Sequence, residues 1–158
     1  MFNSGFRPAI DVGNSVSRVG GSAQTKAIRR ISGRLRLDLA QYREMAAFAQ
    51  FGSDLDKSTQ DKLAQGARLM EVLKQPQFSP YSMEEQTAIL YLAINGFLMD
   101  VAVDKISAFL KGFLEHLHVH NIDLLETIAK TGATTTDIEQ ELSSAIENFK
   151  HSEQSKKQ

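Results

Sequence analysis

The sequence predicts a mainly α-helical protein, in which a helical bundle over residues 24–150 follows a short strand and a loop. Apolar residues recur at steps of three and four along most of that range, which is the spacing of one face of a helix. Serine, threonine and aspartate, which favour helix starts, stand ahead of several apolar runs. The first 23 residues lack this pattern and are rich in glycine and serine.

The first 23 residues predict one strand and one loop. "RPAIDV" is a short extended candidate, because Pro8 disfavours a helical conformation at Arg7. "GNSVSRVGGS" follows it and is typical of a loop, since three glycines in nine residues permit unusual backbone angles. A single strand cannot form a sheet alone. We therefore expect residues 1–23 to complete a sheet whose other strands come from elsewhere.

Two long helices come next. The first begins near residue 24 and carries one apolar face, made of Ile28, Ile31, Leu35, Leu39, Tyr42 and Met45. "FGSDLD" interrupts this face, and Asp56 or Ser58 can cap the following helix. That second helix carries Leu63, Leu69, Met70 and Leu73.

The middle of the chain predicts a rigid loop and a buried helix. Pro76 and Pro80 restrict the loop "KQPQFSPYS". Ser82 and Glu85 have the spacing of a capping box, in which each side chain bonds the other residue's backbone N–H. "QTAILYLAINGFL" follows and is apolar on all sides, as expected of a central helix.

Three further helices complete the predicted bundle. Asp104 can start a fourth helix, which carries Ile106, Phe109, Leu110, Phe113 and Leu117. "NIDLLETIA" predicts a short fifth helix. Thr136 and Glu139 form a second capping-box pair ahead of a last helix, which carries Ile138, Leu142, Ile146 and Phe149. The tail, residues 151–158, has no apolar residue and is expected to fray.

Composition excludes several classes of protein. The chain has no cysteine, so disulfides and thiolate chemistry are excluded. No apolar run approaches the roughly 20 residues that span a bilayer. The net charge of −1 indicates no global attraction to nucleic acid. The start does not have the pattern of a secretory signal or an organelle presequence.

Positive charge is concentrated near the start of the chain, where residues 1–36 hold seven Lys/Arg and one acid. Five of these residues lie on the first helix: Lys26, Arg29, Arg30, Arg34 and Arg36. They could contact phosphates or lipid headgroups. The commoner role of such a stretch, and the one favoured here, is a solvated helix face or one that pairs with acids of a partner.

Two polar clusters could bind ligands. His116 and His120 lie four residues apart on one helix face, with His118 between them, but no convincing third metal ligand is visible, so no metal site is predicted. Gln75 and Gln77 flank Pro76, and amides in a rigid loop can recognise the edge of a base. A polar loop without a ligand remains the plainer interpretation.

Catalytic motifs are missing from the sequence. There is no G-x-x-x-x-G-K-[ST] and no Gly-Lys dipeptide, so the chain cannot build a P-loop. Nor does it offer a plausible set of nucleophile, base and orienting residue. We expect no catalysis from the isolated polypeptide. On its own, Arg18 is an ordinary loop arginine.

Two stretches, "SGFRPAIDVGNSVSRVGGSAQ" and "LDLAQYREMAAFAQFGSDLD", resemble the α subunit of the F-type ATP synthase. The resemblance is to the C-terminal third of that subunit. It is dense from Phe2 to about Gly96, and looser from there to the tail, where helical pattern and the landmarks "GFL" and "KI" remain.

This resemblance implies an architecture of several chains. In the family, three α and three β subunits alternate around a rotating central stalk, and each α subunit has a barrel, a P-loop nucleotide-binding domain and a helical bundle. Residues 1–23 would be the last strand and loop of an incomplete α/β P-loop nucleotide-binding domain. Expected partners are the β subunit, an N-terminal piece of the α subunit, the central-stalk γ subunit and the peripheral stalk. No nucleic acid is expected, and the membrane would be reached only through the complex.

The resemblance also implies roles for single residues. Arg18 matches the arginine finger that reaches into the catalytic site of an adjacent β subunit, with Ser17 beside the same interface. The family also has a non-catalytic nucleotide site. Four residues match the positions that contact the adenine and ribose of that nucleotide: Phe2, Arg7, Gln75 and Gln77. Chains that supply the P-loop would hold the phosphates of ATP or ADP with Mg²⁺. Pro76 departs from the small residue usual between the two glutamines.

Asp54 and Asp56, in the turn after the first helix, match the part of the family that faces the rotor. They are expected either to contact the rotor or simply to cap a helix. Because Met1 matches a point inside the family's central domain, we expect an α subunit that is made in two pieces. The alternatives are an artificial fragment and an incomplete chain. The expected location is the matrix side of the mitochondrial inner membrane, or the cytoplasmic face of a bacterial membrane. The alternative function is a free-standing helical module that binds nucleic acid or acidic lipid through its basic first helix.

Overall fold

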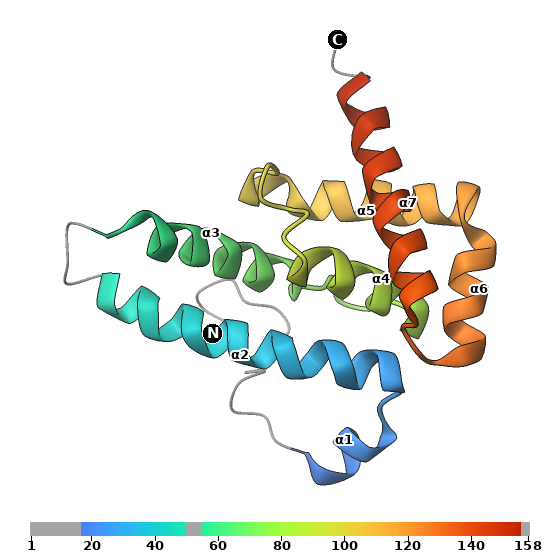
Figure 1. Ribbon diagram of the computed structural model, residues 1–158, viewed down its shortest axis with the longest axis horizontal. Helices are drawn as coiled ribbons and strands as arrows, with labels where there is room; N and C mark the ends of the chain where they lie inside the picture. Colours follow the sequence, from blue (N-terminus) through green and yellow to red (C-terminus); the bar gives the residue numbers. More distant parts are fainter. Residues whose placement is uncertain (1–16, 50–54, 156–158) are drawn as a thin grey trace.

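The computed structural model describes residues 17–49 and 55–155, and Figure 1 shows their arrangement. Within these ranges the chain forms seven α-helices and one short 3₁₀ helix, and no strand. The helices are α1 (Arg18–Ala23), α2 (Lys26–Ala49), α3 (Lys57–Val72), α4 (Met83–Ile94), η2 (Val103–Lys105), α5 (Ile106–His120), α6 (Ile122–Thr131) and α7 (Thr136–Ser155). The predicted helical bundle is confirmed.

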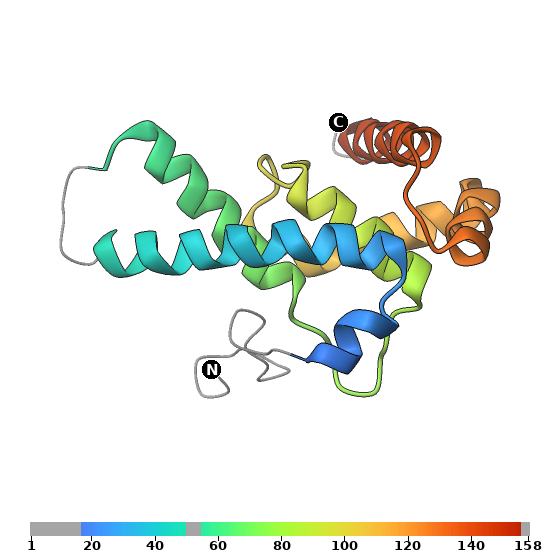
Figure 2. The same ribbon diagram turned by 60° about the horizontal axis from the view of Figure 1, so that its bottom comes forward.

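The predicted N-terminal loop is wrong from residue 18 onward. The strand predicted within residues 7–12 lies outside the described residues. Arg18–Ala23 form the short helix α1, because the Oγ of Ser17 accepts a hydrogen bond from the Gly20 N–H at 2.9 Å and caps the helix. Figures 1 and 2 both place α1 outside the bundle, below the start of α2.

Helices α2 and α3 form an antiparallel pair that extends to one side of the molecule (Figure 1). Helix α2 buries Ala27, Ile31, Leu35 and Leu39, as its apolar face predicted. Asp56 caps α3 by accepting a hydrogen bond from the Thr59 N–H at 3.1 Å. Of the two predicted capping residues, Asp56 and Ser58, it is therefore Asp56 that caps the helix.

Helix α4 is the centre of the bundle. It packs against α2, α3, α6 and α7, and it buries Thr87, Ala88, Ile89, Leu92, Ala93 and Ile94. The Ser82–Glu85 capping box is present at its start. The predicted central helix is therefore confirmed, although it ends at Ile94, because Asn95–Asp100 form turns.

Helices α5, α6 and α7 close the other end of the molecule (Figure 1). Phe109 and Phe113 of α5 pack their rings against Phe149 of α7, with ring centroids 5.0 and 5.7 Å apart. Helix α6 ends at Gly132, whose φ of 58° is the left-handed conformation that glycine adopts without strain. The Gly132 carbonyl accepts the Ala27 N–H at 3.0 Å and so ties α6 to α2.

Three details at helix ends differ from the predictions. Asp104 does not cap α5, because it lies inside η2. Thr135 rather than Thr136 caps α7: its Oγ1 accepts the Ile138 N–H at 3.4 Å and its carbonyl accepts the Glu139 N–H. The tail does not fray at residue 151, since α7 continues to Ser155.

Candidate functional site

The loop between α3 and α4 carries the two predicted glutamines and borders two hollows. One hollow, of about 150 Å³, is lined by Val72, Leu73, Gln75, Tyr81, Gln86, Ile89 and Leu90. The other, of about 210 Å³, is lined by Glu71, Lys74, Gln75, Pro76, Tyr81, Ser107 and Leu110. Gln75 and Tyr81 belong to both linings. Gln77 is exposed and lines neither hollow.

The second half of this loop is fastened to the start of α4. The Gln86 amide donates a hydrogen bond to the Tyr81 carbonyl at 2.8 Å. The Ser82 N–H donates to Oε2 of Glu85 at 2.7 Å. These bonds hold Tyr81 and Ser82, which follow the glutamines in the loop, in one geometry relative to α4.

Phe78, at the tip of the loop, was not singled out by the sequence. Its φ is 62°, a left-handed conformation that is rare for a bulky residue, and its side chain is 92% exposed. Strained residues of this kind concentrate at functional sites. The only signal in the sequence is an aromatic residue placed between two prolines.

Glu85 links this loop to the far end of α5. Nε2 of His118 lies 2.8 Å from Oε1 of Glu85, and the imidazole is the donor because an ionised carboxylate can only accept. Burial acts to raise the pKa of Glu85, but hydrogen bonds from His118 and Ser82 outweigh burial and lower it. The ionised carboxylate therefore bonds two elements at once.

The three histidines of α5 do not converge. The His116 and His120 rings lie with centroids 4.6 Å apart, as their spacing predicted, whereas His118 points to Glu85. Among the residues the structure describes, no three His, Asp or Glu side chains gather in a way that could hold a metal ion.

Ser17 and Arg18 lie at the start of α1. The side chain of Ser17 is occupied as the helix cap, and Arg18 is the first residue of the helix. In the described part of the chain, no hydrogen bond or ion pair joins Ser17 to the Gln75–Gln77 loop. Phe2, Arg7 and Asp54 lie outside the described residues.

Asp56 has a structural role that is visible. Besides the Thr59 N–H, its carboxylate accepts the Thr59 hydroxyl at 2.7 Å. Hydrogen bonds from the Thr59 side chain and then its backbone lower the pKa of Asp56. The side chain is exposed, so it remains accessible to a partner while it caps α3.

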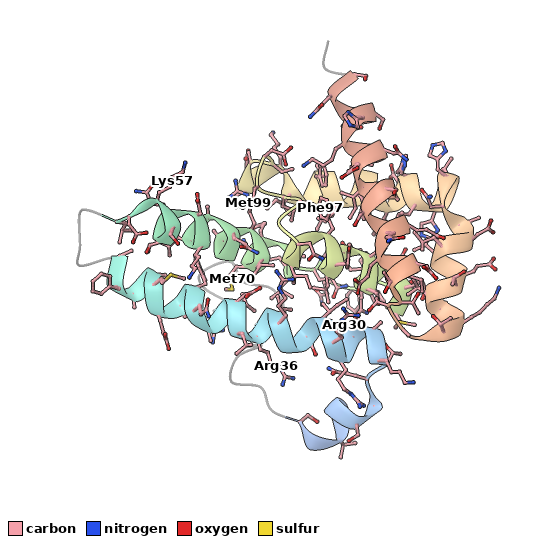
Figure 3. All side chains as sticks on the ribbon, in the orientation of Figure 1. Arg30, Arg36, Lys57, Met70, Phe97 and Met99 are labelled. Carbon is pink, nitrogen blue, oxygen red and sulfur yellow. The ribbon has the colours of Figure 1, made fainter. Side chains whose placement is uncertain are left out.

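The basic residues of α2 divide into two groups. Arg30 pairs with Glu139 at 2.9 Å and donates to the Thr134 carbonyl at 3.3 Å. Arg34 donates to the Asn95 side chain at 3.2 Å. These two arginines fasten α2 to other parts of the bundle. Arg36 instead points away from the bundle (Figure 3).

Comparison with known proteins assigns a family. Residues 24–149 match the sequence profile of the family described as "ATP synthase alpha/beta chain, C terminal domain". The chain belongs to this family. The matched range of the ATP synthase C-terminal domain contains α2 to α6 and most of α7, and with them Gln75, Gln77 and Asp56.

Two curated relatives of this ATP synthase C-terminal domain are bacterial proteins named ATP synthase subunit alpha. One comes from Lawsonia intracellularis (strain PHE/MN1-00) and the other from Syntrophomonas wolfei subsp. wolfei (strain DSM 2245B / Goettingen). Each is 53% identical to this chain over 150 residues, which cover 95% of the chain and 30% of the relative. The chain therefore spans about 30% of the length of these relatives. In the ranges 17–49 and 55–155, no helix of this ATP synthase domain is long and apolar enough to cross a membrane.

Proposed function

We propose that this chain is the C-terminal part of an α subunit in the catalytic head of a rotary, proton-translocating ATP synthase. Its membership of the ATP synthase C-terminal domain family supports this function, together with 53% identity to two proteins named ATP synthase subunit alpha. In this proposal residues 1–23 belong to the nucleotide-binding domain, and residues 24–150 form the helical bundle below it.

Arg18 is the proposed arginine finger, acting in the catalytic site of a neighbouring β subunit. Phosphoryl transfer spreads negative charge over the oxygens of the γ-phosphate, and a planar guanidinium that is always charged can bridge two of them. The capped start of α1 supports this role, because the Ser17 cap fixes the backbone conformation at Arg18. Ser17 would lie beside the same interface.

Gln75 and Gln77, with Phe2 and Arg7, are the proposed contacts to the adenine and ribose of a non-catalytic ATP or ADP. The loop 75–82 is uncharged, and the nearby Lys74 is paired with Glu71. Amides and aromatic rings suit a base and a sugar rather than phosphates. Other chains would therefore hold the phosphates and Mg²⁺.

The proposed partners are the β subunit, the N-terminal part of the α subunit, the γ subunit of the central stalk and the peripheral stalk. Asp54 and Asp56 are proposed to face the central stalk, and the exposed carboxylate of Asp56 is consistent with such a contact. The complex would lie on an energy-coupling membrane. The bacterial relatives support the bacterial alternative over the mitochondrial one.

The decisive experiment changes Arg18 in the assembled complex. Arg18→Ala should lower ATP turnover by about a thousandfold or more, the contribution typical of an arginine finger. Arg18→Lys should restore little, because a point charge cannot bridge two oxygens. Turnover is measured on the purified complex, and native mass spectrometry should find the β and γ subunits still bound.

Gln41→Ala, an exposed change on α2, is the matched control and should leave turnover unchanged. Turnover near the unmodified level in Arg18→Ala would remove the arginine-finger role. A chain that is found alone, without β or γ subunits, would contradict the proposed function itself.

A further inference from the structure

The outward face of α2 carries a row of basic side chains. Arg29 and Arg36 are exposed and lie seven residues apart, so they stand almost in line and about 10.5 Å apart along the helix. Lys26 lies near the start of this row. Figure 3 shows Arg36 pointing away from the bundle, and this residue has no hydrogen-bond or ion-pair partner within residues 17–49 and 55–155.

Arg29 adds to this row while it serves the fold. Its guanidinium donates to the Ser22 carbonyl at 3.1 Å, and the residue remains exposed. Among the exposed positions of α2, Glu44 is the one acidic residue. The basic face, which we define as the exposed residues Lys26, Arg29 and Arg36, is therefore net positive on a chain whose net charge is −1.

Two large apolar side chains border the basic face. Leu37 is 66% exposed and Phe48 is 69% exposed, although both belong to a helix that already buries four residues on its other side. Gly33 is exposed between Arg29 and Arg36, and Ala40 and Ala47 are exposed further along α2. At Gly33 an added Cβ would meet nothing within 4 Å. The short side chains beside the arginines thus leave room for a partner to approach the helix backbone, and Leu37 and Phe48 provide apolar groups along one edge.

We propose that the basic face, together with Leu37 and Phe48, binds an acidic amphipathic helix of a partner protein. Acidic side chains at heptad spacing would meet Arg29 and Arg36, and the small residues would let a second helix approach closely. Aliphatic side chains of the partner would cover Leu37 and Phe48. The inference rests on α2 alone and goes beyond the proposed nucleotide and arginine-finger roles.

The same observations favour a protein helix over the other ligands of basic surfaces. A phosphate backbone would leave Leu37 and Phe48 uncovered. A helix that lies on a membrane inserts a continuous apolar face, whereas the continuous apolar face of α2 is buried in the bundle. Nucleic acid and acidic lipid therefore become alternative outcomes of the test.

The test measures binding of the full chain to a synthetic helical peptide with glutamate at every seventh position and leucine beside it. Fluorescence anisotropy at about 50 mM and about 200 mM salt gives the affinity and its salt dependence. Arg36→Glu should weaken binding about tenfold or more at the lower salt, since an attraction becomes a repulsion. Leu37→Ala should also weaken binding, with an unchanged salt dependence.

Lys111→Glu on α5 is the matched control, because it makes the same charge change on a side chain that is 81% exposed and lies on another helix. It should alter the affinity less than about twofold. Circular dichroism verifies that each variant is folded, and Arg36→Gln serves in place of Arg36→Glu if the reversal disturbs the helix.

Three results would overturn the proposal. The acidic peptide could fail to bind in a saturable manner. Arg36→Glu and Lys111→Glu could have equal effects on its affinity. Vesicles of phosphatidylcholine and phosphatidylserine, or random-sequence duplex DNA, could bind the unmodified chain more tightly than the peptide does.

Discussion

Gly66 of α3 packs directly against Tyr42 of α2. A Cβ added there would overlap the ring and the Cβ of Tyr42. Because both groups belong to packed helices, neither can move away freely. The missing side chain of Gly66 thus sets the distance between the two helices.

Gly66→Ala should lower the free energy of unfolding by about 1–3 kcal/mol, the usual cost of forcing extra volume into a packed contact. Chemical denaturation followed by circular dichroism measures it. Gly33→Ala is the matched control, because it lies inside α2 facing open space, and it should raise stability by about 0.5–1 kcal/mol. Equal effects of the two changes would show that Gly66 is not a contact residue.

At the scale of residues, the sequence revealed contacts that depend on near neighbours. The Ser82–Glu85 capping box was readable because its spacing of three is the signal itself. The Arg30–Glu139 ion pair was not readable, because nothing in the sequence relates residues so far apart. The left-handed Phe78 was also missed, since a phenylalanine gives no local sign of that conformation.

At the scale of elements, the contact between α4 and α5 depends on pH through Glu85. The pKa of Glu85 in the folded chain lies below its ordinary value of 4.5. Ionised Glu85 therefore raises the free energy of unfolding at pH values above 4.5. This stabilisation is lost as the pH falls through the folded-state pKa of Glu85.

Glu85→Gln should therefore destabilise the chain near pH 7, and its effect should shrink at an acidic pH below the folded-state pKa of Glu85, which itself lies below 4.5. Urea denaturation at the two pH values provides the measurement. Glu84→Gln, a change in the same first turn of α4 outside the capping box, separates the helix-dipole effect from the specific bonds. A Glu85→Gln effect that is the same at both pH values would contradict the assigned bonds.

Helix boundaries were predictable where a capping residue stood alone, and less so where two candidates were adjacent. Thr135 and Thr136 are chemically identical, so the sequence could not distinguish which one caps α7. Helix α1 was missed because two glycines disfavour a helix in general, whereas the Ser17 cap supplies the Gly20 N–H with a partner. Arg68 was not singled out either, yet its guanidinium donates to the carbonyls of Leu98, Met99 and Val101 and closes the turn after α4.

At the scale of the whole molecule, stability depends on α4. Leu92 is completely buried, and its helix packs against four others. Leu92→Ala should lower the free energy of unfolding by about 2–5 kcal/mol, a large share of the roughly 5–15 kcal/mol typical of a folded domain. Thermal and urea unfolding measure the loss.

Leu90→Ala is the control for this prediction, because Leu90 is half-buried on the same helix. It should cost clearly less than Leu92→Ala. If the two changes cost the same, the core is not centred on the buried face of α4.

The fold class followed from apolar periodicity, and the central position of α4 followed from its apolar composition on all sides. The candidate site was less predictable. The sequence placed Gln75 and Gln77 in one rigid loop, but it gave no sign that only Gln75 borders the two hollows. That difference arises from the packing of α3, α4 and α5 around the loop, which is a property of tertiary structure.

The ties between the start of α2 and residues 132–134 have a consequence for biosynthesis. Arg30 donates to a carbonyl 104 residues later in the chain, and Ala27 donates to Gly132. At translation rates of about 5–20 residues per second, α2 waits roughly 5–20 s for these partners. Its first two turns, with Ala27 and Ile31, are therefore the last part of α2 to be covered, and the part on which a chaperone has the longest time to act.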